Sequence, residues 1–170
     1  MALHDLSRMI AVLACAALTV VCLAADVSAQ STAKPRVSKD IERGRYLVMI
    51  TGCNDCHTPN FLVNGGKIPE KDRLVGDNLG WRGPWGTTYP VNLRLYFQDM
   101  TEDIWVQMAK EMRRRPPMPY YSLNAMSEAD VRAIYKYIRY LGPAGTPAPK
   151  FIPPDKEPPQ PYVQFPASAQ

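Results

Sequence analysis

The sequence contains few of the side chains that bind metals or form disulfides. Two histidines and four cysteines occur in 170 residues, and His4, Cys15 and Cys22 all lie near the start of the chain. The net charge is only +4, whereas a dedicated nucleic-acid-binding protein is much richer in Lys and Arg, so no nucleic acid is expected among the partners. Long apolar runs are also scarce, because residues 9–25 form the only one.

That apolar run belongs to a predicted secretory signal peptide, residues 1–29. Arg8 supplies a positive charge before the run, and the small residues at 27–29 provide the expected cleavage site. Export to the periplasm follows from this prediction. An uncleaved membrane anchor is the alternative, although about 17 apolar residues are short for a helix that spans a bilayer.

Removal of the signal would leave two cysteines and one histidine, which together form Cys53-Asn54-Asp55-Cys56-His57. This C-x-x-C-H motif is typical of covalent haem c attachment. Two thiols on one side of a helical turn can each form a thioether with a haem vinyl group, and the next side chain can bind the iron. We therefore expect one haem c, attached through Cys53 and Cys56, with His57 as an axial ligand of its iron.

Three other interpretations of the motif fit the sequence less well. A thioredoxin-like redox pair requires C-x-x-C between a strand and a helix, and no strand alternation surrounds these residues. A zinc site requires four ligands, and no further cysteine or histidine follows residue 57. A structural disulfide beside a histidine is the third alternative, because exported proteins often contain disulfides.

Met118 is the expected second axial ligand, because no second histidine would remain in the exported chain. The candidate methionines are Met49, Met100, Met108, Met112, Met118 and Met126. All except Met118 lie in or beside predicted helices, where methionine usually fills core space. Met118 lies between prolines in a segment that cannot be helical, so its sulfur can be held over the iron with little loss of entropy. An iron with an open or weakly bound sixth position is the alternative.

Three helices are predicted from capping residues and apolar periodicity. Ser38, Thr101 and Ser127 are the expected N-caps, and acidic residues follow each of them in the first turn. Glycines or prolines follow each helix and end it. These helices form the body of a predicted all-α domain, residues 38–142, in which long irregular segments join them.

The other segments of the chain carry no predicted helix. Residues 30–37 are a polar lead-in, and residues 58–90 form a glycine-rich loop whose aromatic residues suit wrapping around a large flat apolar object. Residues 143–170 contain nine of the 17 prolines and are predicted to be an extended tail. The tail either straps across the domain or is disordered.

The sequence around these motifs resembles the class I c-type cytochromes. The resembling segments are residues 43–48 and 53–59, Met118-Pro119 and residues 126–138. Residues 83–90 with Asn92 and Leu93 are similar to single domains in cytochrome subunits of membrane-associated bacterial dehydrogenases. The resemblance implies an all-α cytochrome c fold, with three main helices and long loops around one covalently bound haem.

The same resemblance implies an electron carrier rather than an enzyme. Such a protein takes one electron at a time from a dehydrogenase-type donor and passes it to a respiratory acceptor such as an oxidase, with no small-molecule substrate. Methionine and histidine ligation suits this role because it raises the reduction potential. Association with a membrane complex is also implied.

The resemblance further implies a close crossing of the first and last helices. Gly44 and Tyr46 are the candidates for contact on the first helix, and Tyr137 and Leu141 are the candidates on the last. It also implies a backbone carbonyl that accepts a hydrogen bond from the ligand histidine and so fixes its ring. Pro84 is the candidate for supplying that carbonyl.

Several residues of the glycine-rich loop and its flank are candidates to line the haem or to hydrogen-bond its propionates. They are Trp81, Arg82, Pro84, Trp85, Tyr89 and Asn92. Plain packing is the alternative for each of them. Three consecutive arginines at 113–115 are either a solvated face or a basic collar that steers docking to an acidic redox partner.

Two functional alternatives remain open at this point. In the first, the chain is a haem-bearing docking subunit of a dehydrogenase complex, and its proline-rich tail is the docking arm. In the second, the iron has an open face for gas binding or peroxidase chemistry. The second lacks a distal histidine, and Met118 would block the open face.

Overall fold

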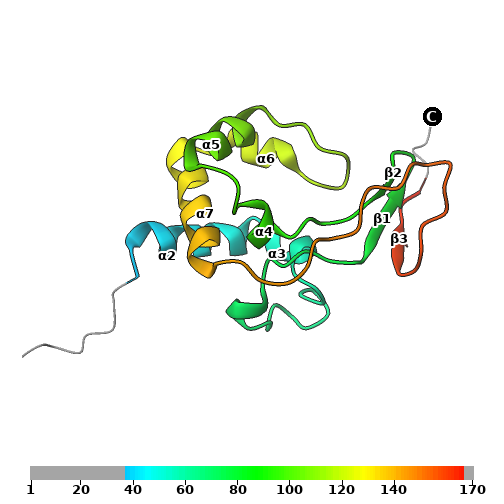
Figure 1. Cartoon of the computed structure of the whole chain (residues 1–170), viewed down its shortest axis with the longest axis horizontal. Coiled ribbons are helices and arrows are strands. Elements are labelled where there is room, and N and C mark those ends of the chain that lie inside the picture. Colours follow the sequence, from blue (N-terminus) through cyan, green and yellow to red (C-terminus); the bar gives the residue numbers. More distant parts are fainter. Residues whose placement is uncertain (1–36, 167–170) are drawn as a thin grey trace, which may run out of the picture. The chain divides into compact units, whose positions relative to one another are not determined.

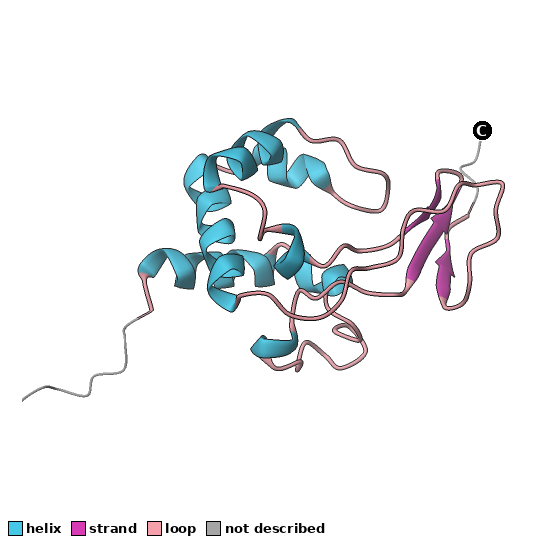
Figure 2. Cartoon of the chain, viewed as in Figure 1, coloured by secondary structure: helices cyan, strands magenta, loops and turns pink. Residues whose placement is uncertain are grey.

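The computed structural model describes residues 37–166, which belong to one compact unit of the chain. The predicted signal peptide, and all of the lead-in except Val37, lie outside these residues. In chain order the elements are α2 (Lys39–Ile50), α3 (Cys53–His57), the 3-10 helix η1 (Glu70–Asp72), β1 (Gly80–Gly83), β2 (Gly86–Thr88), α4 (Leu93–Tyr96), α5 (Glu102–Glu111), α6 (Tyr120–Ala125), α7 (Glu128–Leu141) and β3 (Tyr162–Gln164) (Figure 1 and Figure 2). Within this part of the chain, no helix combines the length and apolar character needed to cross a membrane.

The three predicted helices are present as α2, α5 and α7, and each begins at the expected cap. The cap oxygens accept hydrogen bonds from backbone N–H groups three residues later: Ser38 from Ile41 (3.3 Å), Thr101 from Ile104 (3.3 Å) and Ser127 from Asp130 (3.1 Å). These bonds satisfy N–H groups that the first turn of a helix leaves without partners. The capping pattern therefore predicted the three main helices correctly.

The close crossing of α2 and α7 depends on Gly44. A Cβ atom added to Gly44 would lie 2.7 Å from the Cβ of Tyr137, and closer still to the carbonyl oxygen of Ala133. The predicted contact between Gly44 and Tyr137 is thus confirmed. The prediction for Tyr46 is wrong, because 53% of its surface is exposed, and the adjacent Leu47 is buried in its place.

The apolar core lies where α2, α5 and α7 pack together. Phe97 and Trp105 pack with tilted rings, whose centroids lie 4.6 Å apart, and the indole N–H of Trp105 donates to the Val131 carbonyl at 3.0 Å. The predicted contact residue Leu141 is only partly buried and packs at the edge of this cluster. The indole hydrogen bond thus joins α5 to α7 inside a small apolar core.

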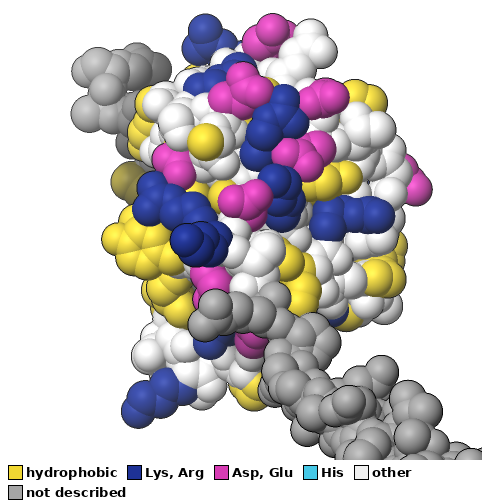
Figure 3. All heavy atoms as spheres, turned by 90° about the vertical axis from the view of Figure 1, so that its left-hand side faces the viewer, with side chains coloured by type: hydrophobic (Ala, Val, Ile, Leu, Met, Phe, Trp, Pro, Cys, Tyr) yellow, Lys and Arg dark blue, Asp and Glu magenta, His cyan; other side chains and the backbone are white. Residues whose placement is uncertain are grey.

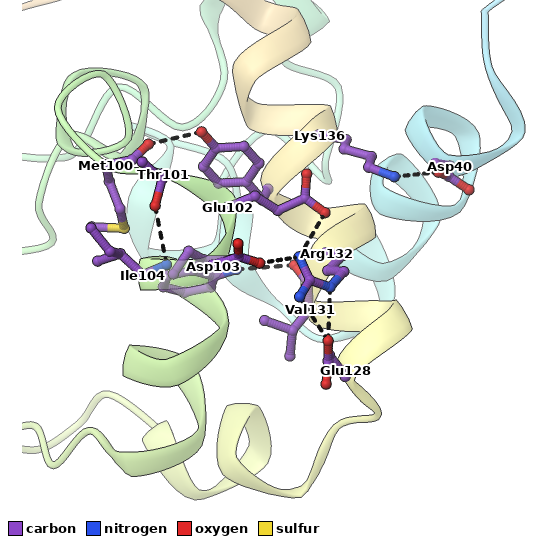
Figure 4. A network of polar contacts seen from close by, with 12 residues as sticks. Asp40, Met100, Thr101, Glu102, Asp103, Ile104, Glu128, Val131, Arg132 and Lys136 are labelled. Atoms are coloured by element: carbon purple, nitrogen blue, oxygen red, sulfur yellow. Dashed lines mark hydrogen bonds and ion pairs between the residues drawn. The ribbon is translucent and has the colours of Figure 1, made fainter.

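Charged side chains tie the helices together on the outer side of this core. Acidic and basic groups are interspersed over this face (Figure 3). Arg132 pairs with Glu102, Asp103 and Glu128, and Lys136 pairs with Asp40 at 2.6 Å (Figure 4). Exposed pairs of this kind contribute less than about 1 kcal/mol each. Together they link α7 to α5 through Arg132 and α7 to α2 through Lys136.

The expectation of an all-α fold is wrong, because residues of the glycine-rich loop and the tail form a three-stranded sheet. Its strand order is β2-β1-β3, with β1 antiparallel to β2 and parallel to β3. Gly86, at φ +99, ends the two-residue turn between β1 and β2, and a side chain there would meet the tail. Glycines that looked like loop punctuation thus permit a tight hairpin.

The proline-rich tail is ordered against this hairpin as far as residue 166. After α7 it runs beside the segments that lead into and out of the hairpin, then supplies β3 (Figure 1). Ile152 exchanges two backbone hydrogen bonds with Thr87, at 2.7 and 3.0 Å. Phe165 packs on Trp81 and Trp85, with ring centroids 5.9 and 5.4 Å apart. Of the two predicted arrangements, the strap is the one observed.

Alanine at Gly44 is expected to lower the free energy of unfolding by about 2 kcal/mol. The gain in helix propensity, about 0.5–1 kcal/mol, is smaller than the cost of forcing a methyl group against backbone atoms that cannot rotate away. Urea unfolding of the variant measures the difference. Gln107→Ala, at an exposed position of α5, is the matched control and should stay within about 0.5 kcal/mol of the parent. Equal stability of Gly44→Ala and the parent would contradict the tight crossing.

Candidate functional site

The C-x-x-C-H motif forms its own short helix, α3, immediately after α2. Gly52 separates the two helices in a left-handed conformation (φ +71), which glycine adopts at little cost. Cys53 and Cys56 lie one turn apart in α3, and both are free thiols. The predicted arrangement, two thiols on one side of a helical turn followed by a histidine, is therefore present.

The ring of His57 is buried and held in one orientation. Only 8% of its surface is exposed, and Nδ1 lies 2.8 Å from the carbonyl oxygen of Val91. A carbonyl only accepts hydrogen bonds, so Nδ1 carries the proton and donates it. Burial lowers the pKa of His57, and the hydrogen bond to Val91 offsets this only in part. With the proton on Nδ1, Nε2 is the atom of the His57 ring whose lone pair could bind a metal.

Backbone pairing places the Val91 carbonyl beside this ring. Gly76 N–H donates to the His57 carbonyl at 2.9 Å, and Asp77 N–H donates to the Pro90 carbonyl at 3.1 Å. A side chain at Gly76 would lie 2.7 Å from the Asn92 nitrogen, so the two segments approach closely. The prediction that Pro84 supplies the carbonyl is wrong, because Val91 supplies it and Pro84 lies in the exposed hairpin turn.

Asn92 holds the chain in place directly after Val91. The Asn92 side chain caps α4 by accepting a bond from Leu95 N–H at 3.0 Å. It also donates to the carbonyls of Ala144 (2.8 Å) and Thr146 (3.1 Å) in the tail. Asn92, a candidate for the haem pocket, is therefore engaged in holding the tail.

The surroundings of the two thiols disfavour the thiolate form that redox exchange requires. Burial raises the pKa of the Cys53 thiol, and burial together with the nearby Asp55 raises the pKa of Cys56. Reactive C-x-x-C pairs have lowered thiol pKa values instead. Residues 37–166 also contain no group of three or more His, Cys, Asp or Glu side chains suited to hold a metal ion, whereas structural zinc requires four ligands. The thioredoxin-like and zinc alternatives thus gain no support.

Four buried polar atoms of the hairpin have no hydrogen-bond partner among the described residues. They are Trp81 Nε1, Trp85 Nε1, Thr87 Oγ1 and Tyr89 OH. Buried donors without partners are rare, and each calls for an explanation. Indole N–H groups can only donate, so they suit an acceptor such as a carboxylate. Haem carries two propionate carboxylates, and this donor set therefore fits the group that the motif implies.

Arg82 binds the tail, so its guanidinium is not free to bind a ligand. Its guanidinium donates to the Lys156 carbonyl at 2.8 Å and pairs with Glu157 at 3.0 Å. Among the six loop candidates, three therefore carry unpaired donors (Trp81, Trp85 and Tyr89), two bind the tail (Arg82 and Asn92), and Pro84 is exposed at the turn. The aromatic candidates remain the best fit to a haem pocket.

Met118 lies in a non-helical segment, residues 112–119, between α5 and α6. Its side chain is partly buried and borders the same apolar cluster that Cys53 borders. The sulfur of Met108, by contrast, accepts a hydrogen bond from the Tyr96 hydroxyl at 3.1 Å, and Met112 is buried in the core. These positions fit the choice of Met118 over those two methionines.

The three arginines before Met118 are exposed, and each is supported by an aromatic ring. Arg113 lies over Tyr120, Arg114 donates to the Tyr96 hydroxyl at 3.3 Å, and Arg115 lies 3.9 Å from the ring centre of Phe151. They line one shallow pocket, and no carboxylate within the described part of the chain pairs with them. The cluster is thus an exposed basic surface without a carboxylate partner among the described residues.

Sequence reasoning missed two residues of this region. Val91 acts through its backbone carbonyl, which its side chain does not reveal. Thr88 links the hairpin to the methionine segment, because its hydroxyl donates to the Pro116 carbonyl at 2.9 Å. A threonine in a glycine-rich loop gives no signal of such a long-range contact.

Comparison with known proteins gives no match. Neither a family model, a curated protein nor a solved structure is similar to this chain at a significant level. The functional argument therefore depends on the site itself.

Proposed function

We propose that the protein is an exported c-type cytochrome with one covalent haem, and that it transfers one electron at a time between redox partners. The observation that carries the proposal is the imidazole of His57, which a hydrogen bond from Nδ1–H to the Val91 carbonyl holds in one orientation directly after two partly buried cysteines on one helical turn. Bound haem c would supply the iron(II)/iron(III) couple.

The state of the two thiols supports covalent attachment. Each S–H adds across one vinyl C=C bond to give a thioether, so no atom is lost and no oxidant is needed. The addition requires reduced sulfur, and Cys53 and Cys56 are both free thiols.

Met118 and the hairpin donors complete the proposed site. Met118 would bind the iron opposite His57, and the donors of Trp81, Trp85 and Tyr89 would bind propionate oxygens. A closed sixth position favours electron transfer over gas binding or peroxidase chemistry. The docking-subunit alternative gains no support from the tail, because residues 143–166 pack on the hairpin of the same chain.

A redox titration of the purified holoprotein, monitored optically, tests this function. We expect one reversible transition that fits a single electron, and no binding of carbon monoxide to the reduced protein. Rapid carbon monoxide binding would mean an open iron, and the gas-binding or peroxidase alternative would then replace the carrier.

The arginine cluster, residues 113–115, is expected to accelerate electron exchange with negatively charged partners. Replacing all three with glutamine should slow oxidation by ferricyanide about 10-fold at low salt and weaken its salt dependence, because the attractive field is lost. Stopped-flow mixing measures the rates. A cationic ruthenium complex, which the arginines repel, is the probe of opposite charge. Lys39, Lys67 and Lys71, exposed elsewhere, are the matched charge control when replaced with glutamine. Equal slowing in both triple variants would mean that net charge, and not this cluster, sets the rate.

A further inference from the structure

We propose that the C-terminal segment, residues 143–166, is a positioning strap for the iron ligand Met118. This inference rests on the proposed function, because it assigns a role to the strap in closing the sixth position of the iron. Two separate contacts run from the strap region to residues 115–116. Both reach the chain just before the ligand.

The first contact is direct. Phe151 of the strap lies under the guanidinium of Arg115, with 3.9 Å from the guanidinium carbon to the ring centre. At this distance a cation–π interaction contributes about 0.5–1 kcal/mol when exposed. Arg115 pairs with no carboxylate in the described part of the chain, so the ring is its main partner.

The second contact passes through the hairpin. Ile152 pairs with Thr87 through two backbone hydrogen bonds, and the adjacent Thr88 donates from its hydroxyl to the Pro116 carbonyl at 2.9 Å. Neighbouring strap residues, Phe151 and Ile152, therefore fix neighbouring residues of the ligand segment.

The strap itself is firmly held, so it can act as a support. Phe165 N–H donates to the Arg82 carbonyl at 2.7 Å, and Gly80 N–H donates to the Pro161 carbonyl at 3.0 Å. The Asn92 side chain binds the start of the strap. The strap is thus held at both ends. It begins beside Asn92, the neighbour of Val91, and it ends in the sheet as strand β3.

The ligand segment has little other support at this point. Residues 113–117 belong to no helix or strand, and α6 begins only at Tyr120. Prolines at 116, 117 and 119 fix φ at three positions, so a displacement at residues 115–116 carries through to Met118. Loosening the strap contacts should therefore release the methionine more often without disturbing haem attachment.

The test uses the full-length holoprotein with both contacts removed, as Thr88→Val and Phe151→Leu together. Valine keeps the shape of threonine but cannot donate, and leucine keeps apolar volume but has no ring face. We expect carbon monoxide to bind the reduced variant about 10-fold faster than the parent, because each lost contact raises the released fraction several-fold. The weak near-infrared band of methionine-ligated iron(III) should also lose intensity.

A control double variant, Thr146→Val with Tyr140→Leu, likewise removes a threonine hydroxyl and an exposed aromatic ring, but away from these contacts. Its carbon monoxide binding should equal that of the parent. Covalent haem content and urea unfolding are measured in all variants, because a merely structural role would lower stability without changing ligand release in the native protein.

Three outcomes separate the possibilities. Faster binding in Thr88→Val/Phe151→Leu alone, with unchanged haem content, supports the strap. Equal binding in the parent and both double variants overturns it and leaves the carrier function intact. Rapid binding already in the parent shows that Met118 does not close the iron, and then the proposed ligation fails together with this inference.

Discussion

Serine at both Cys53 and Cys56 is expected to give a protein without covalently bound haem. A hydroxyl does not add to a vinyl group under the conditions in which a thiol does, so both thioethers are lost. Either single substitution should leave one thioether in place and should greatly decrease the yield of covalently bound haem. Haem-dependent peroxidase staining after denaturing electrophoresis measures the result, because only covalently attached haem stays with the chain.

The chain contains its own matched control for this experiment. Cys15 and Cys22 lie in the predicted signal peptide, outside the described residues, and serine at both should leave haem attachment unchanged. Full covalent haem in the Cys53→Ser/Cys56→Ser variant would contradict the assignment of the motif. Loss of haem in the control would show instead that export had failed.

Leucine at Met118 is expected to open the sixth position of the iron and lower the reduction potential. Leucine has nearly the same volume as methionine, so packing against the apolar cluster is conserved while the sulfur is lost. Axial ligation tunes haem potentials over roughly 0.8 V in total, so the shift should be large. The reduced variant should bind carbon monoxide stoichiometrically, whereas the parent should not.

Met49→Leu is the matched control for the loss of a methionine sulfur. Met49 is 42% exposed on α2, so its sulfur is not needed for the core or for the proposed ligation. Its carbon monoxide binding and potential should equal those of the parent. If Met118→Leu also behaves as the parent does, the second ligand is another group, or the position is open in both.

The main helices follow from local signals in the sequence. Ser38, Thr101 and Ser127 each precede acidic residues and an apolar stripe, and the energy of a cap depends only on the first turn that follows it. Such short-range determinants are visible in a single sequence. The place of Gly44 at the helix crossing came instead from the resemblance to the class I c-type cytochromes, and the structure supplies the reason, because a Cβ there would collide with the backbone of α7.

The sheet could not be predicted in the same way. Its strands are three or four residues long, too short for an alternating pattern, and β1 pairs with β3 about 80 residues away along the chain. The prolines of the tail indicated an extended chain but not its partner. Loop glycines such as Gly86 become informative only once the tail that passes over them is known.

The arrangement of the C-x-x-C-H motif was predictable, whereas the contacts that surround it were not. Cys53, Cys56 and His57 form a motif of fixed spacing, and α3 places them as that spacing requires. The acceptor for the histidine is the Val91 carbonyl, and any residue could supply it, so the choice of Pro84 failed. The hydroxyl of Thr88, which holds the methionine segment, was hidden for a different reason, because 28 residues separate Thr88 from its acceptor Pro116 along the chain.

The central claim is covalent haem on this chain, and the most direct measurement is the optical spectrum of the denatured parent protein in alkaline pyridine. The account predicts a haem that stays with the chain and shows the spectrum of a haem whose two vinyl groups are both saturated. A haem that separates from the chain, or that shows the spectrum of unmodified vinyl groups, would contradict the account.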